Sequence, residues 1–306
     1  MEFQHLDFTK VKFYSIKDRK SKVRVEDFAR CEVTGSFSDF FSSIPTILAG
    51  KDLKEIVNIL TTARNNGEPI IFSFGAHIVK CGVSPCLIEL MKSGFFSLLA
   101  TNGAGIIHDL EIAFFGHTSE FVSENIKDGS FGMARELPQL INPLVTGKEG
   151  LGEELKKVFQ VFSPSYKEKS LLYWAYKLKI PFTVHIAIGS DILHLHPSFD
   201  PAKTAEASFK DFKLLIEAIS SLESKGVIWN VGSAVILPTV IEKAISLARN
   251  LGAEVSGFTG ITFDFLNNYR SNLCPPQRAR ELGGRGYYII GHHEILIPLI
   301  TWALLI

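Results

Sequence analysis

Residues 82–114 read GVSPCLIELMKSGFFSLLATNGAGIIHDLEIAF, and they contain in order a helix, an apolar run and a second helix. Ser84-Pro85 is typical of a helix start, and Gly94 is typical of a helix end. The apolar run FFSLLAT (95–101) predicts a buried strand, and the small residues of TNGAG (101–105) predict a tight turn into the next helix. This stretch therefore indicates an α/β protein.

The same alternation extends outward from this stretch along most of the chain. The apolar runs are almost continuously hydrophobic, which favours parallel strands that are covered on both faces. We therefore expect an α/β fold of the Rossmann-like type, a parallel sheet with helices on both faces. The predicted strands are PIIFSF (69–74), FFSLLAT (95–101), FTVHIAI (182–188), GVIWNV (226–231), EVSGFT (254–259) and YYIIG (287–291).

Several helices can be predicted from caps and periodicity. Ser163-Pro164 predicts a helix start, and Pro238 precedes a helix that Gly252 closes. The run ILIPLITWALLI (295–306) is too short for the roughly 20 residues that span a bilayer, so it predicts a buried terminal helix. Segment 204–224 predicts a core helix whose apolar stripe is Phe209, Phe212, Leu215, Ile216 and Ile219.

Composition bounds the class of protein. The 306 residues are 46% hydrophobic and carry 32 basic and 32 acidic side chains, so we expect a small-molecule ligand and neither a nucleic acid nor a membrane. Four scattered cysteines and an amino terminus without an apolar signal core favour a cytoplasmic location. No linker divides the chain, so we expect one domain over 51–306 and an appended arm over 1–50.

Ligands of parallel α/β sheets bind beyond the carboxyl ends of the strands, and two predicted junctions there are rich in small residues. The first, FGAHIVKCG (74–82), carries His77 and Lys80 between two glycines, which could equally serve only the turn. The second is the turn 101–105, whose amides and following helix could hold a phosphate of a dinucleotide. It lacks the third glycine of the G-x-G-x-x-G fingerprint.

Two other junctions combine carboxylates with imidazoles. Asp191 follows a predicted strand and precedes His194 and His196, whose rings would share one side of an extended chain. His292, His293 and Glu294 follow the last predicted strand. Such groups suit acid–base catalysis or metal binding, although histidines at a surface or in ordinary hydrogen bonds give the same pattern.

Four segments in this order resemble the deoxyhypusine synthase family. Residues 82–114 are similar to its helix, strand and small-residue turn that lead to an acidic helix, with HDL (108–110) closest to archaeal members. PFTVHIAIGSDI (181–192) looks like its P-x-x-x-P-A-x-x-D-G-S segment, and 226–265 looks like its glycine-rich strand, helix and T-A-Q-E-F-D sequence. GHHEILIPLI (291–300) looks like A-D-A-S-x-x-x-P-L. The resemblance covers about 69–305.

The resemblance implies a Rossmann-like homotetramer that binds NAD and the polyamine spermidine at subunit interfaces, and that transfers an aminobutyl group through an enzyme lysine. By position, Asn102, Gly103 and Ala104 would face the NAD pyrophosphate or ribose. Thr259 and Asp264 would hold the nucleotide, and Asp109 matches an acidic residue of the turn. Asp191 corresponds approximately to the cofactor aspartate of the family, and His292 replaces another aspartate that contacts the nucleotide.

The chain departs from the family where the nucleophile should be. The W-G-K element is absent, Lys243 is the last lysine, and 264–291 offers only arginines, which stay protonated. We therefore expect that the protein is not a true deoxyhypusine synthase and forms no enzyme-bound imine, unless Lys80 reaches the pocket from another strand end.

Three functions remain open from the sequence. The first is an NAD-dependent enzyme, a transferase or oxidoreductase, that acts on a small amine or alcohol as a homo-oligomer, with Asp191, His194, His292 or Glu294 as acid–base groups. The second is a metal-dependent enzyme that uses Asp191, His194, His196, His292 and His293. The third is a non-catalytic nucleotide-binding protein.

Overall fold

The computed structural model describes residues 7–20, 23–31, 35–222 and 225–306. The chain divides into two compact units, 1–51 and 52–306. The described residues of the first unit form three short 3-10 helices, η1 (Phe8–Lys10), η2 (Ile16–Asp18) and η3 (Val25–Asp27), and helix α1 (Phe37–Ser43). Helix α2 (Leu48–Asn65) begins in the first unit and lies mostly in the second.

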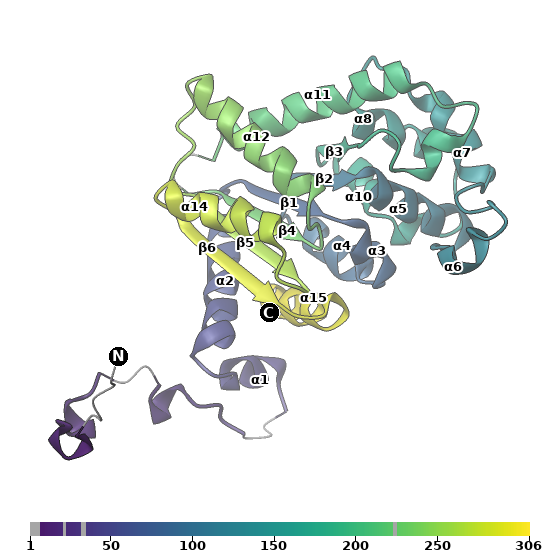
Figure 1. Cartoon of the computed structure of the whole chain (residues 1–306). Coiled ribbons are helices and arrows are strands. Elements are labelled where there is room, and N and C mark those ends of the chain that lie inside the picture. Colours follow the sequence, from purple (N-terminus) through teal and green to yellow (C-terminus); the bar gives the residue numbers. More distant parts are fainter. Residues whose placement is uncertain (1–6, 21–22, 32–34, 223–224) are drawn as a thin grey trace, which may run out of the picture. The chain divides into compact units, whose positions relative to one another are not determined.

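The second unit is built on one six-stranded sheet in the order β3-β2-β1-β4-β5-β6 (Figure 1). All five neighbouring pairs are parallel, so the carboxyl ends of the six strands meet at one edge. The predicted Rossmann-like α/β fold is confirmed. The strands are β1 (Ile70–Phe74), β2 (Leu98–Asn102), β3 (Phe182–His185), β4 (Val227–Val231), β5 (Thr259–Asp264) and β6 (Arg285–Ile290).

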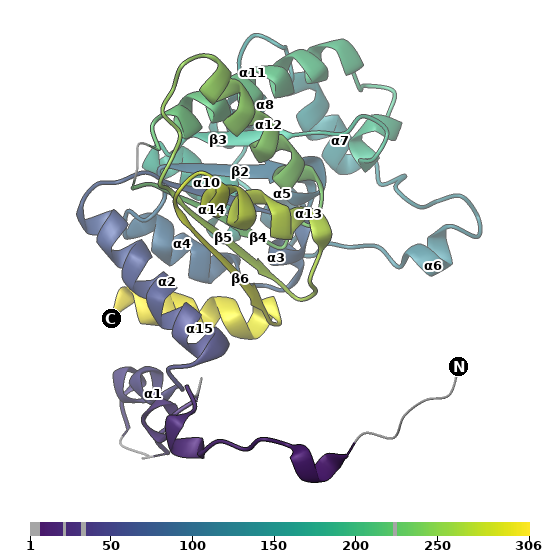
Figure 2. The same ribbon diagram turned by 60° about the vertical axis from the view of Figure 1, so that its left-hand side comes forward.

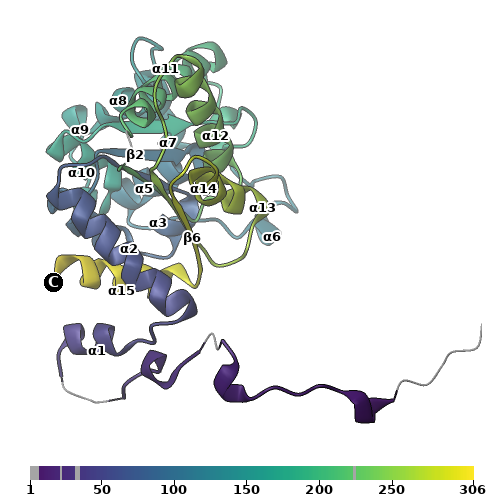
Figure 3. The same ribbon diagram turned by 90° about the vertical axis from the view of Figure 1, so that its left-hand side faces the viewer.

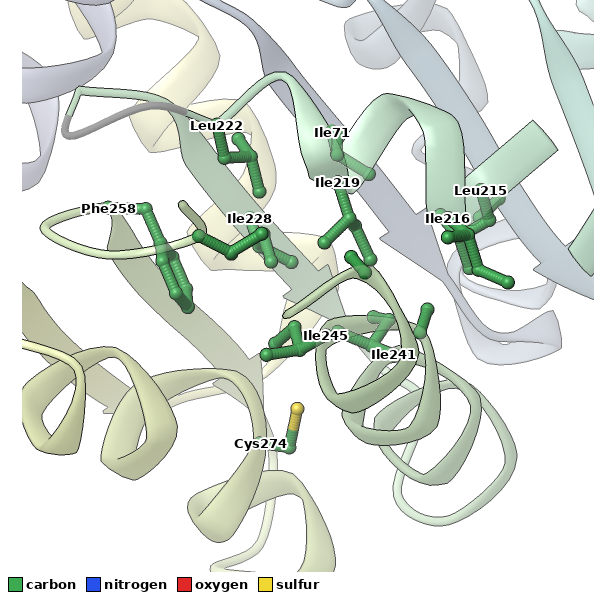
Figure 4. Close-up of a cluster of buried hydrophobic side chains, with 14 of the residues drawn as sticks. Ile71, Leu215, Ile216, Ile219, Leu222, Ile228, Ile241, Ile245, Phe258 and Cys274 are labelled. Carbon is green, nitrogen blue, oxygen red and sulfur yellow. The ribbon is translucent and has the colours of Figure 1, made fainter. Parts of the chain in front are cut away.

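One face of the sheet packs against helices α11 (Pro201–Ser220) and α12 (Ile236–Asn250). Ile71 of β1 and Ile228 of β4 meet Ile219 of α11 and Ile241 of α12 in a continuous apolar core (Figure 4). The predicted stripe of α11 is confirmed at Leu215, Ile216 and Ile219, which are buried, whereas Phe209 is exposed.

The opposite face is covered by α4 (Ser84–Lys92) and α15 (His293–Leu305), with α2 alongside α15 (Figures 2 and 3). Trp229 of β4 makes edge-to-face contacts with Phe72 and Phe263 on the neighbouring strands, at 5.2 and 5.4 Å between ring centroids. Buried side chains on both faces explain why the strands read as continuous apolar runs.

The remaining elements connect these layers. Most of them lie between β2 and β3, where the chain forms a series of short helices. In chain order, all of these connecting elements are α3 (Ala76–Lys80), α5 (Gly103–Phe115), α6 (Val122–Asn125), α7 (Glu136–Ile141), η4 (Asn142–Leu144), α8 (Leu151–Lys156), α9 (Val158–Val161), η5 (Lys167–Lys169), α10 (Leu171–Leu178), η6 (Ile192–Leu195), α13 (Tyr269–Asn272), the π-helix η7 (Leu273–Gln277) and α14 (Arg278–Glu281).

Two predicted boundaries are wrong. The helix predicted at Ser163-Pro164 begins instead at Leu171, because Ser170 accepts a hydrogen bond from the N–H of Tyr173 and caps α10. The strand predicted over 254–259 is β5, which begins at Thr259 and runs to Asp264, because TGITFD is the segment that pairs with β4. This shift moves Thr259 from the carboxyl end of the strand to its amino end.

The carboxy-terminal helix is only half buried, against the prediction. Ile297 and Ile300 of α15 are fully buried, while Ile295 and Trp302 are 68% and 58% exposed. Within the described part of the chain, every helix is too short or too polar to cross a lipid bilayer.

Candidate functional site

One face of α5 lines a cavity of about 200 Å³ at the carboxyl edge of the sheet. Ala104, Ile107, His108 and Glu111 follow one another at helical spacing, so their side chains share that face. Its other walls come from the end of α3, from α6 and the loops on both sides of it, and from the segment after β3 that leads into η6. They are Lys80, Ser119, Glu120, Val122, Phe131, Ser190, Asp191 and Ile192.

The cavity carries three carboxylates and one amine. Glu111 accepts a hydrogen bond from the Thr118 hydroxyl and lies 3.2 Å from Nδ1 of His108. Burial raises the pKa of Glu111, but the hydrogen bonds from His108 and Thr118 outweigh it, and the pKa is lowered overall. Glu120 accepts from the Asn125 amide at 2.9 Å. Together with Asp191 these residues give three carboxylates against the single amine of Lys80, so the cavity favours a cationic ligand.

Asp191 stands out because its Oδ2 is buried without a hydrogen-bond partner in the described structure. The loop after β3 holds this carboxyl against α5, and burial raises its pKa. His194 accepts from the N–H groups of Gly189 and Asp191 through Nδ1, so its proton lies on Nε2, 3.9 Å from Asp191 Oδ2. An unpaired buried carboxylate oxygen is costly, and a ligand that donates a hydrogen bond would satisfy it.

The small-residue turn, for which a phosphate site is predicted, forms the cap of α5 and lies against Asp191. Asn102 caps α5 by accepting from the N–H of Gly105 at 2.8 Å. The space over Gly103 is filled by Asp191, because a β carbon on Gly103 would lie 1.9 Å from Oδ2. The amino end of α5 thus already faces a carboxylate, which would repel a pyrophosphate. Of the three residues predicted to face the NAD pyrophosphate or ribose, Asn102, Gly103 and Ala104, it is Ala104 that lines the cavity.

The other residues assigned to a nucleotide lie in different surroundings. Asp109 is buried and accepts from the Leu171 and Leu172 N–H groups and from the Ser170 hydroxyl, so it fixes the start of α10. Thr259 lies at the amino edge of the sheet, opposite the cavity. Asp264 does end β5, but it is buried and bonded to Phe265 N–H and to Asn268. These three residues lie in different surroundings within the chain, and their role in binding a nucleotide stays a prediction.

The imidazole clusters also separate. His292 is 70% exposed and lies 3.7 Å from Glu294, outside the cavity. His196 bonds to Ser198 in the loop after β3. The five residues predicted as metal ligands therefore do not converge, and His293 instead meets two residues that were not predicted as ligands.

These partners are His77 and Cys81 of the first glycine-bracketed turn. Nδ1 of His77 lies 2.8 Å from Nδ1 of His293, and Cys81 Sγ lies 3.4 Å from Nε2 of His77. Burial, together with the neighbouring Glu294 carboxylate, raises the pKa of the Cys81 thiol to about 11. The spacing of His77 and Cys81, one helical turn apart, was visible in the sequence, but their meeting with His293 depends on the sheet order.

Comparison with known proteins confirms the resemblance drawn from the sequence. The chain is 25% identical to the "probable deoxyhypusine synthase" of Sulfurisphaera tokodaii over 228 residues, which cover 66% of this chain and 71% of the relative. No family model matches the chain.

Solved structures show the same fold. A conserved "putative LOR/SDH protein" from Methanococcus maripaludis has a TM-score of 0.57 at 14% identity, covering 94% of this chain and 74% of that one. A "putative deoxyhypusine synthase" from Entamoeba histolytica has a TM-score of 0.52 at 11% identity, covering 88% and 93%. AgrE, solved as a ternary complex with ornithine and NAD⁺, has a TM-score of 0.55 at 14% identity and covers 83% of this chain.

The chain spans about a third of AgrE and of the cyanobacterial arginine dihydrolase ArgZ, at 32% of each. At these identities the likeness concerns the fold alone. It agrees with the Rossmann-like α/β architecture.

Proposed function

We propose that the protein is a deoxyhypusine-synthase-like enzyme that binds a small cationic amine in the cavity over α5. The observation that carries the proposal is the unpaired, buried Oδ2 of Asp191, a residue that lines the same cavity as Glu111 and Glu120. An ammonium group would donate a charge-assisted hydrogen bond to this oxygen. Ile107, Val122 and Phe131 supply an apolar wall for a short alkyl chain.

The size of the cavity supports a small ligand. About 200 Å³ is below the range of roughly 300–1,000 Å³ that is typical of drug-sized ligands. Carboxylates separated by apolar side chains suit an alkyl diamine or polyamine, whose cationic ends are separated by methylene groups. Asp191 would accept a proton from the amine, and the Nε2–H of His194 would stabilise the carboxylate in its ionised form.

We also propose NAD as the cofactor, at the carboxyl edge of the sheet. The strand order 3-2-1-4-5-6, which has its switch point between β1 and β4, supports this, as does the NAD⁺-bound AgrE neighbour. The residues assigned to NAD by resemblance lie apart within one chain, so we derive no step through the cofactor. A homo-oligomer, which light scattering would detect, remains a proposal from the resemblance.

The test is calorimetric titration of the full chain with spermidine and 1,4-diaminobutane, each with and without NAD, and with 1-butanol as the uncharged analogue. We expect binding of the amines and none of the alcohol. Asp191→Asn should weaken amine binding by about tenfold or more, because a hydrogen bond to a charged group contributes roughly 1.5–3 kcal/mol.

Asp200→Asn is the matched control, since it makes the same change at the cap of α11, and asparagine also caps helices. Equal affinity of the wild type and Asp191→Asn for the amines would remove Asp191 from the site. Absence of amine binding to the folded wild type, with or without NAD, would end the proposal.

A further inference from the structure

His77, Cys81 and His293 bring three metal-binding atoms together from segments far apart in the chain. His77 and Cys81 lie four residues apart at α3, so both face the same side of its single turn. His293 is the first residue of α15, 216 residues after His77. One nitrogen or sulfur atom of each residue lies within 4.8 Å of the other two.

The cluster lies at the switch point of the sheet, where this fold binds ligands. The loops after β1 and β4 touch here, since Gly75 donates its N–H to the carbonyl of Val231 at 3.0 Å. A β carbon on Gly232 of the β4 loop would lie 3.1 Å from Cε1 of His293. The imidazole of His293 therefore stands directly over the junction of β1 and β4.

The surroundings of His293 fix which nitrogen is available. Its Nε2–H donates to the carbonyl of Phe263 at 3.2 Å, so Nδ1 carries the lone pair and points toward His77. Metal-ligating histidines commonly donate their second ring N–H to a backbone carbonyl in this way. The ring is fully buried, and its orientation is held by the end of β5.

We propose that His77, Cys81 and His293 bind a zinc ion, with the fourth coordination position open to solvent or to Glu294. Two imidazoles and one thiolate are ligands that Zn²⁺ prefers. Zinc–nitrogen and zinc–sulfur bonds of about 2.0–2.3 Å place tetrahedral ligand atoms about 3.3–3.6 Å apart, so small side-chain rotations suffice from the present distances. The proposal does not rest on the amine cavity or on bound NAD, although the cluster lies at the switch point that also supports NAD binding.

The same atoms could instead form a hydrogen-bonded chain without metal. The Cys81 thiol would donate to His77 Nε2, His77 Nδ1–H to His293 Nδ1, and His293 Nε2–H to Phe263. However, Cys81 Sγ lies 3.4 and 3.6 Å from the two nitrogens of His77, so the sulfur is not aligned with one lone pair. The position of the sulfur favours the metal, whereas the 2.8 Å between the two Nδ1 atoms fits the hydrogen-bonded arrangement, which is the contrary outcome of the test.

The experiment uses full-length protein stripped with a chelator, then titrated with Zn²⁺ in competition with a chromophoric chelator, and separately with Co²⁺. We expect one equivalent of metal and a thiolate-to-cobalt charge-transfer band in the near ultraviolet. Cys81→Ser should abolish the band and weaken Zn²⁺ binding by more than the roughly 10–100-fold that loss of an outer-shell partner costs.

Cys86→Ser and His292→Gln are the matched controls, because each makes a like change at a residue outside the cluster. Both should retain the band and the affinity. Because His293 is fully buried, His77→Gln serves as the second ligand variant, with circular dichroism to verify the fold. Metal binding that Cys81→Ser and His77→Gln leave unchanged, or no stoichiometric binding by the wild type, would assign the cluster to the hydrogen-bonded chain.

Discussion

The carboxylate of Asp191 occupies the space that a side chain on Gly103 would need. A β carbon built on Gly103 would lie 1.9 Å from Oδ2 and 2.5 Å from Cγ of Asp191. Gly103 has no positive φ, so its role is this close approach rather than backbone freedom. The close approach of a neighbouring carboxylate thus explains the glycine of the turn.

Gly103→Ala should therefore displace Asp191 and weaken amine binding, because the methyl group cannot coexist with the present position of the carboxylate. We expect a loss of about tenfold or more, comparable with Asp191→Asn. Calorimetry with 1,4-diaminobutane provides the measurement. Gly291→Ala is the control at another strand-to-helix junction, where a β carbon would make an ordinary contact at 3.5 Å. Full amine affinity in Gly103→Ala would contradict the assignment.

Asp109 should matter for stability and not for ligand binding. It accepts three hydrogen bonds at the start of α10 from a fully buried position, although burial raises its pKa to about 6. Asp109→Ala would leave buried N–H groups of Leu171 and Leu172 unpaired, each at a cost of about 1–3 kcal/mol. Urea denaturation should show this loss, while amine and NAD affinities of the folded variant stay unchanged. A weaker affinity for NAD would restore the role implied by the resemblance.

Asp211 of α11 should make stability depend on pH. Its Oδ2 accepts from the N–H groups of Val184 and Gly152, while Oδ1 is unpaired, and burial raises its pKa to about 7. As pH rises, the carboxyl group of Asp211 ionises first in the unfolded chain, near its ordinary pKa of 3.8, and later in the folded protein. The contribution of Asp211 to the free energy of unfolding therefore falls between about pH 4 and 7 and is constant above pH 7. The fall amounts to about 4 kcal/mol.

Asp211→Asn mimics the protonated acid, so its stability relative to the wild type should rise by about 4 kcal/mol from pH 4 to 8. Glu154→Gln is the opposite-sign control. Burial raises the pKa of Glu154, but hydrogen bonds from Thr146 and from backbone N–H groups lower it overall. That variant should lose stability near neutral pH and recover in acid. Denaturation curves of the wild type and both variants, measured at each pH, provide the comparison. A difference in the free energy of unfolding between Asp211→Asn and the wild type that does not change with pH would contradict the burial argument.

The fold could be predicted because its signals are local. Continuous apolar runs identified most strands, since strands buried on both faces leave no polar alternation, and caps and periodicity identified the helices α4, α5, α11, α12 and α15. The exception is β5, because Thr259 alone of 254–259 pairs with the neighbouring strands and the strand continues to Asp264. Strand pairing depends on residues that are distant in the sequence, and a local stretch of sequence does not specify them.

The site could be predicted only in part. Asp191, Ala104 and Lys80 were singled out because they follow strand ends, and all three line the cavity. Glu111 lies one turn after His108 on the same face of α5, so the helical period could have indicated it. Glu120 comes from a loop whose position no periodicity gives. The meeting of His77 with His293 likewise required the strand order.

The final prediction concerns Lys80, which is the lysine among the residues that line the cavity. Lysine nucleophiles are activated by desolvation in an apolar pocket or by a neighbouring cation. Lys80 is instead exposed and shares its cavity with Glu111, Glu120 and Asp191. Lys80 therefore lacks the desolvation that activates a lysine nucleophile, and we expect that the protein forms no imine during turnover.

The experiment supplies labelled 4-aminobutanal directly, so that the result does not depend on oxidation of an amine by NAD. After borohydride reduction, peptide mass spectrometry should find no label at Lys80 above the level of exposed lysines such as Lys92. Parallel incubation with NAD and labelled spermidine tests the complete reaction. Selective label on Lys80, lost in Lys80→Met, would show that the nucleophile of the resembling family has moved to α3. Equal labelling of Lys80 and Lys92 would reflect surface chemistry, and the cavity would then act on its amine through Asp191 without a covalent intermediate.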